Sequence, residues 1–101
     1  MKLKTFLFLH RRAPAAAGPE AFDLAMTAAA FDQEVTLLLL DDAVHWLNQG
    51  LPELVRESVE TIAVEHQSLI ERGMTLPSGL RSFERDAIAA LIAAADVVVQ
   101  G

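Results

Sequence analysis

The side chains best suited to chemistry are two adjacent carboxylates, Asp41 and Asp42, and the imidazole of His45. The acidic pair directly follows an apolar run, Val35–Leu40, and such strand ends are where function collects in open α/β sheets. Three interpretations of the pair are open: a metal or phosphoryl-acceptor site, a carboxylate cap for a turn that begins at Ala43, and a loop that shapes a subunit interface. A metal site would need further carboxylates, and none ends the first apolar stretch. We therefore favour the cap.

His45 follows the two aspartates by four and three residues, so a hydrogen-bonded Asp–His pair fits on one helical turn. Such a pair could act as a general base, but the spacing ties no serine or cysteine nucleophile to it. We therefore favour a structural or interface histidine. Trp46, with Val44 and Leu47 beside it, is an amphipathic anchor of the kind enriched at interfaces. We expect these three apolar side chains to form a contact surface.

Two further predicted strand ends carry polar side chains. His10, Arg11 and Arg12 follow the first strand, and Glu65 and His66 end the third. Because parallel strands bring their carboxyl ends to one edge of a sheet, we expect all of these residues to lie on one rim with the acidic pair. A triple-histidine metal site is one alternative there, but no spacing such as HExxH supports it, and we expect no metal and no cofactor. The arginines could hold an anion or pair with the acidic rim.

The apolar pattern predicts one α/β domain over residues 1–101. The predicted strands are Lys4–Leu9, Val35–Leu40, Val59–Glu65 and Asp96–Gln100, with Leu80–Phe83 as a candidate fifth. One predicted helix begins at Pro19 and ends near Phe31, and three more cover Leu51–Glu57, Gln67–Arg72 and Asp86–Ala95. The segment His10–Pro19 is predicted to be a loop. This order indicates a three-layer α/β/α fold with a mainly parallel sheet of four to five strands.

Composition excludes several classes of function. The formal net charge is −6 with lysine and arginine scattered, so there is no concentrated basic face for nucleic acid. No run approaches the ~20 apolar residues of a membrane helix. Near the N-terminus Thr5 interrupts the apolar run, which favours a strand of the domain over a signal peptide and a cytoplasmic location. The chain contains no cysteine, which excludes a disulfide, a thiolate metal site and a persulfide on its own sulfur.

Four short segments, in register, resemble the DsrE/DsrF-like family, and in particular its TusC/DsrF-type subunits. They are RRAP after the first strand, AAFD at a helix end, DDAV where that family has DDGV, and the helix SLIERG. The resemblance covers residues 4–76 well and 86–100 loosely. It implies a three-layer subunit of a sulfur-relay complex, with TusB-like and TusD-like, or DsrH-like and DsrE-like, partners. The context would be tRNA 2-thiouridine synthesis or sulfur oxidation.

In the family, a persulfide is carried on a cysteine of the TusD/DsrE-type subunit, just before a helix that ends in an Arg-Gly pair. Counting back from Arg72 and Gly73, the corresponding position here is about Glu65. The resemblance therefore implies a subunit without catalysis of its own. The chain departs from the family pattern in two ways. Ala43 stands in place of the family's glycine, so the turn should use ordinary backbone angles. The segments 50–59 and 74–83 are short, which puts a fourth strand in question.

Two other functions remain open from the residues themselves. One is a stand-alone, self-associating module of the same fold that binds an anion or a small molecule on the rim. The other is an independent hydrolase or metal enzyme that uses His45, His66 and the aspartates.

Overall fold

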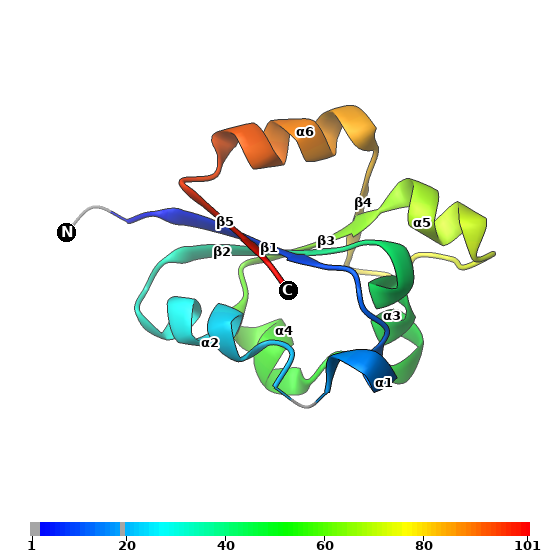
Figure 1. The fold of residues 1–101 in the computed structure, drawn as a ribbon, viewed down its shortest axis with the longest axis horizontal. Helices are drawn as coiled ribbons and strands as arrows, with labels where there is room; N and C mark the ends of the chain where they lie inside the picture. The colour runs from blue at the N-terminus through cyan, green and yellow to red at the C-terminus, as the bar shows by residue number, and fades with distance from the viewer. Residues whose placement is uncertain (1–2, 19) are drawn as a thin grey trace.

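Five strands form one sheet in this computed structural model, which describes residues 3–18 and 20–101 (Figure 1). The strands are β1 Thr5–His10, β2 Glu34–Leu39, β3 Thr61–Glu65, β4 Arg81–Phe83 and β5 Val97–Gln100. Their order is β4-β3-β2-β1-β5, and every pairing is parallel. The predicted α/β fold is confirmed, with a sheet that is wholly rather than mainly parallel. The strand in question, β4, is present.

Helices cover both faces of the sheet, as Figure 1 shows. One face carries α5 and α6, and the other carries α1 to α4. Their bounds are α1 Pro14–Ala17, α2 Asp23–Ala30, α3 Trp46–Gln49, α4 Glu53–Ser58, α5 His66–Glu71 and α6 Arg85–Ala94, and a 3-10 turn, η1, covers Asp41–His45. Within the residues that the structure describes, no helix has both the length and the apolar character needed to cross a membrane.

The central strand β2 is buried on both faces because its side chains alternate between two cores. Leu37 and Leu39 belong to the larger core on the α2 face, whereas Leu38 and Leu40 belong to a smaller core with Ile88 of α6. An unbroken run of leucines is what a central parallel strand requires, since both of its faces are covered. The acidic pair that follows this run therefore lies at the carboxyl end of the central, buried strand β2.

The segment predicted as a loop before α2 is different in the structure. Pro14 begins the four-residue helix α1, because its fixed φ suits a first helical turn and its missing N–H is not needed there. Helix α2 begins at Asp23 rather than at Pro19, which lies outside the described residues. Phe22 precedes the helix and packs into the core, so the apolar stripe began before the helix itself.

Candidate functional site

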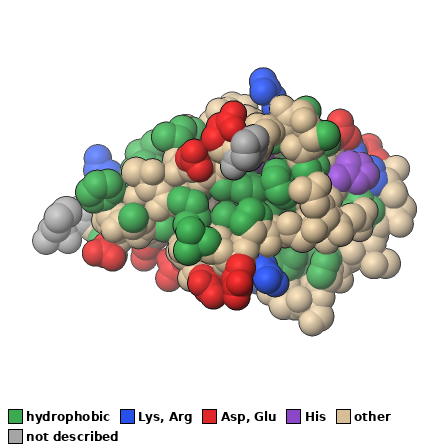
Figure 2. Space-filling view, turned by 90° about the horizontal axis from the view of Figure 1, so that it is seen from below, with side chains coloured by type: hydrophobic (Ala, Val, Ile, Leu, Met, Phe, Trp, Pro, Cys, Tyr) green, Lys and Arg blue, Asp and Glu red, His purple; other side chains and the backbone are tan. Residues whose placement is uncertain are grey.

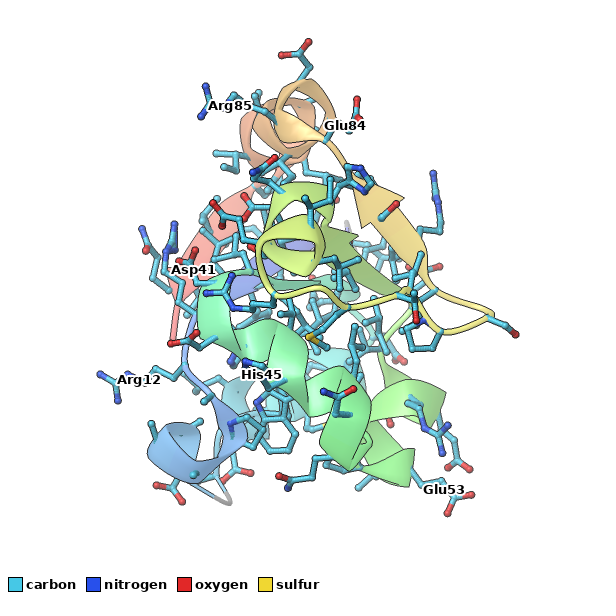
Figure 3. The ribbon with its side chains drawn as sticks, turned by 90° about the vertical axis from the view of Figure 1, so that its right-hand side faces the viewer. Arg12, Asp41, His45, Glu53, Glu84 and Arg85 are labelled. Atoms are coloured by element: carbon cyan, nitrogen blue, oxygen red, sulfur yellow. The ribbon has the colours of Figure 1, made fainter. Side chains whose placement is uncertain are left out.

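The carboxyl ends of β1, β2 and β3 meet on one side of the molecule, which faces the viewer in Figure 3. We call the exposed and half-buried polar groups there the polar rim. Its members are Arg11, Arg12, Asp41, Asp42, His45, Glu65, His66 and Arg72. In Figure 3, Asp41 lies between Glu84 and Arg85 above it and Arg12 and His45 below it, so the labelled groups are spread over this face rather than directed at one point.

Asp41 starts the turn η1 and does not cap it. The residue before the turn is Leu40, no side chain caps the turn, and the backbone N–H of Ala43 donates to the Leu40 carbonyl at 3.1 Å. Asp41 has a φ of 53°, a left-handed conformation that aspartate tolerates better than most residues. The expected cap and the expectation of ordinary backbone angles are therefore wrong. The left-handed angle lies at Asp41, and its carboxylate is 3.6 Å from Arg11 Nε.

A buried hydroxyl anchors the turn to helix α5. The backbone N–H of Asp41 donates to Ser68 Oγ at 2.8 Å, and Ser68 Oγ donates in turn to a carboxylate oxygen of Glu65. Ser68 is completely buried. Its hydroxyl thus joins the end of β2 to the end of β3, and a buried polar group of this kind is costly to leave unpaired. Ser68 was not among the predicted site residues, although its spacing of three from Glu65 across a helix start was a signal.

Arg72, at the end of α5, adds a second link between this helix and the turn η1. Its Nη2 and Nε lie 2.9 and 3.3 Å from Asp42 Oδ1, and its Nη1 donates to the Ser68 carbonyl at 3.2 Å. From the sequence, Arg72 was expected only to end a helix. The acidic pair is therefore held by arginines, and in the described part of the chain no hydrogen bond or ion pair joins either aspartate to His45. The Asp–His base is not formed.

His10 lies in the core rather than on the rim. Its ring packs at 4.9 Å from the ring of Phe22, which in turn packs edge-on against Trp46 at 4.8 Å. Burial lowers the pKa of His10 from its ordinary value of 6.5, because the charged form loses its hydration. With His10 inside, the rim does not offer three histidines, and no cluster of three metal-ligating side chains lies within residues 3–18 and 20–101.

The expectation that Val44 and Trp46 form an apolar contact surface is also wrong. Val44 is fully buried and Trp46 is 6% exposed, and both pack in the larger core; only Leu47 is half-buried. The tight η1 turn directs both side chains inward over the end of the sheet. Trp46 Nε1 has no hydrogen-bond partner among the described residues. The indole ring of Trp46 therefore packs in the core and does not form a contact surface.

A polar cleft lies beside Glu65, between the starts of α5 and α6. Its volume is about 480 Å³, and its lining residues are Glu65, His66, Gln67, Glu71, Glu84 and Arg85. Three carboxylates against one arginine make the cleft a poor anion site and a suitable one for a cationic loop. Glu65 and His66, predicted from strand three, are the two expected rim residues that it brings together. The contribution of Glu84 and Arg85, at the start of α6, was not predicted from the sequence.

His10 provides a pH-dependent prediction. Because its pKa is lowered in the folded state, the unfolded chain binds the proton first as the pH falls. The free energy of unfolding should therefore be highest above pH 6.5. It should decrease as the pH falls below 6.5, until the imidazole of the folded protein is protonated as well. Urea unfolding at about pH 7.5 and 5.5 measures this change, and His10→Leu should reduce it. Equal changes in the wild type and the variant would contradict this prediction.

The comparisons with known proteins agree with the fold. A family model described as the DsrE/DsrF-like family matches residues 2–100. The intracellular sulfur oxidation protein DsrF of Allochromatium vinosum is 34% identical over 89 residues, an alignment that covers 72% of this chain and 65% of that protein. The crystal structure of the ychN protein from E. coli superposes with a TM-score of 0.75 at 19% identity, covering 98% of this chain and 100% of that one. The chain therefore belongs to the DsrE/DsrF-like family.

Proposed function

We propose that this protein is a DsrF/TusC-type subunit of a sulfur-relay complex, which completes the assembly without carrying sulfur itself. The observation that carries the proposal is Glu65 at the end of β3, directly before α5, in a chain without cysteine. According to the family resemblance, the cysteine-bearing subunits carry their persulfide cysteine at about this position. A carboxylate cannot take over a sulfur atom, so the sulfur chemistry falls to a partner.

The rim is built to present a fixed surface rather than to turn over a substrate. Ser68 and Arg72 join η1 to α5, and Arg11 pairs with Asp41. These contacts keep the acidic pair and Glu65 in one arrangement beside the polar cleft. We infer that a cationic loop of a DsrE-type or DsrH-type subunit docks against this acidic cleft, since opposite charges steer and orient association.

The relationship to a protein named for sulfur oxidation favours that context over tRNA thiolation. A cytoplasmic location is part of the same proposal. The alternative, a stand-alone module that binds an anion on the rim, is less well supported because Arg11 is engaged by Asp41 and the cleft beside Glu65 is acidic.

The test is co-expression with a cysteine-bearing DsrE-type subunit encoded in the same organism. The tagged wild-type chain should capture that subunit at a fixed stoichiometry. Glu84→Lys, which reverses one carboxylate of the cleft, should weaken capture by about tenfold. Glu53→Lys is the matched control, because Glu53 is a charge at the start of α4, far from Glu84 in Figure 3.

Two results would contradict the proposal. One is the absence of a complex when both subunits are folded, as judged by circular dichroism. The other is an equal loss of capture in the two variants, which would place the partner away from the cleft.

A further inference from the structure

An apolar groove lies on the α2 face of the sheet, away from the polar rim. Its volume is about 590 Å³, and its lining residues are Lys4, Phe6, Phe8, Leu24, Thr27, Ala28, Phe31, Gln33 and Val99. The floor is formed by the rings of Phe6 and Phe8, whose centroids are 6.1 Å apart with nearly parallel planes, and by Val99 of the edge strand β5. The wall is one side of α2.

Among the described residues that line the groove, α2 supplies the only helical wall, and the groove is open on the other side. Leu24 in the first turn of α2 and Phe31, which directly follows the helix, are 67% and 72% exposed. In Figure 2, which looks onto the helices α1 to α4 from below, hydrophobic side chains gather over much of this face and acidic side chains flank them. A contiguous apolar surface next to a groove marks an interaction site more often than scattered exposed leucines do.

The residues along this surface would allow it to pack against a second copy of itself. The wall of α2 presents Leu24, Thr27, Ala28 and Phe31 at the spacing of one helical stripe, with the large side chains at its ends and the small ones in the middle. Two such stripes, placed antiparallel, would set Leu24 of each copy against Phe31 of the other. The small central residues would allow the helices to approach closely, and each Phe31 would lie next to a groove that can receive it.

The charges at the two ends of the stripe are also complementary under the same arrangement. Lys4 lies at the Phe31 end, where its backbone N–H donates to Gln33 Oε1 at 2.8 Å and the Gln33 amide donates to the Phe31 carbonyl. Asp23 lies at the Leu24 end, in the first turn of α2. A two-fold axis across the middle of the stripe would bring Lys4 of each copy toward Asp23 of the other. In an isologous interface such a contact is made twice.

We propose that a second copy of this chain docks in this groove, with the two α2 helices antiparallel. The surface is distinct from the polar rim, so a homodimer formed through it leaves the acidic cleft accessible to a different subunit. The proposal goes beyond the proposed function and does not depend on it.

The first experiment measures the mass of the purified full chain by sedimentation and light scattering. At about 100 µM, a dimer with a Kd near 1 µM leaves little monomer, and the wild type should show twice its chain mass of 11.0 kDa. Phe31→Asp should weaken association by at least about 100-fold, because it places a charge on an apolar contact. Leu54→Asp on α4, which alters an equally exposed leucine outside the groove, should leave the dimer intact.

The second experiment tests the antiparallel arrangement. Lys4→Glu alone should weaken the dimer, since it faces Asp23 of the other copy, and Lys4→Glu combined with Asp23→Lys should restore it. Circular dichroism checks that each variant keeps its helices. Restoration by the charge swap is a result that a merely general loss of stability would not produce.

Several outcomes would overturn the proposal: a wild type that is monomeric at this concentration, a dimer that Phe31→Asp leaves unchanged, or one that Leu54→Asp breaks equally. A monomeric wild type that captures the cysteine-bearing subunit, with capture lost in Phe31→Asp, would assign the groove to that subunit instead. Because the cleft variant Glu84→Lys is measured separately, failure here is distinguishable from failure of the proposed function.

Discussion

Replacing Trp46 by alanine should lower the free energy of unfolding by about 3–5 kcal/mol, because a large buried ring is removed from a packed core. Trp46 contacts Phe22, which contacts His10, so the cavity would open in the middle of an aromatic cluster. Urea unfolding followed by circular dichroism measures the change. Trp46→Phe should cost less, since it keeps an aromatic ring and removes an N–H that has no partner among the described residues.

Leu54→Ala is the matched control for this prediction. Leu54 is 63% exposed on α4, so its truncation should change the free energy of unfolding by no more than about 0.5 kcal/mol. A Trp46→Ala variant of unchanged stability that fails to bind a partner subunit would restore the interpretation of Trp46 as an interface anchor and contradict its burial.

Ser68→Ala should lower the free energy of unfolding by about 1–3 kcal/mol, because the change leaves two polar groups without their partner. The backbone N–H of Asp41 loses its acceptor and the carboxylate of Glu65 loses its donor, on the side that faces the buried Ser68. The variant should also loosen the left-handed turn at Asp41 and so weaken any binding that depends on the polar rim. Denaturant unfolding measures the first effect and subunit capture measures the second.

A double-mutant cycle with Glu65→Gln isolates this contact. If the hydroxyl acts on the charged carboxylate, Ser68→Ala should cost less in the Glu65→Gln background than in the wild type. Ser78→Ala is the control, since Ser78 is an exposed loop serine. Additive effects of the two substitutions would show that Ser68 and Glu65 do not interact in solution.

Much of the fold could be predicted from local pattern. The leucine run of β2 indicated a strand buried on both faces, and the alternation of strands and helices indicated a parallel sheet. Among the elements that were missed or shifted, α1 and the start of α2 lie close to Gly18. Their positions depend on where Phe22 packs rather than on helix propensity, since a four-residue helix has little stability of its own.

The candidate site could be predicted only in outline. Strand ends placed Arg11, Asp41, Asp42 and Glu65 on one rim, because parallel strands share a carboxyl edge. The same reasoning placed His10 on that rim, and the amphipathic character of Trp46 placed Trp46 and Val44 on the surface, but all three side chains are buried. Which side of a short turn faces the core depends on how closely η1 folds back over the sheet, and that angle is not encoded in a spacing of three or four residues.

The sequence by itself determined where the strands lie along the chain, the acidic balance and the absence of a thiol, since each of these is a property of local pattern or composition. Only the tertiary structure decided that Ser68 and Arg72 hold the acidic turn, and that α6 completes the cleft beside Glu65. It also decided that the apolar surface lies on α2 and not around Trp46. The physical reason is that these features join residues far apart in the chain, whose contacts depend on packing rather than on local pattern.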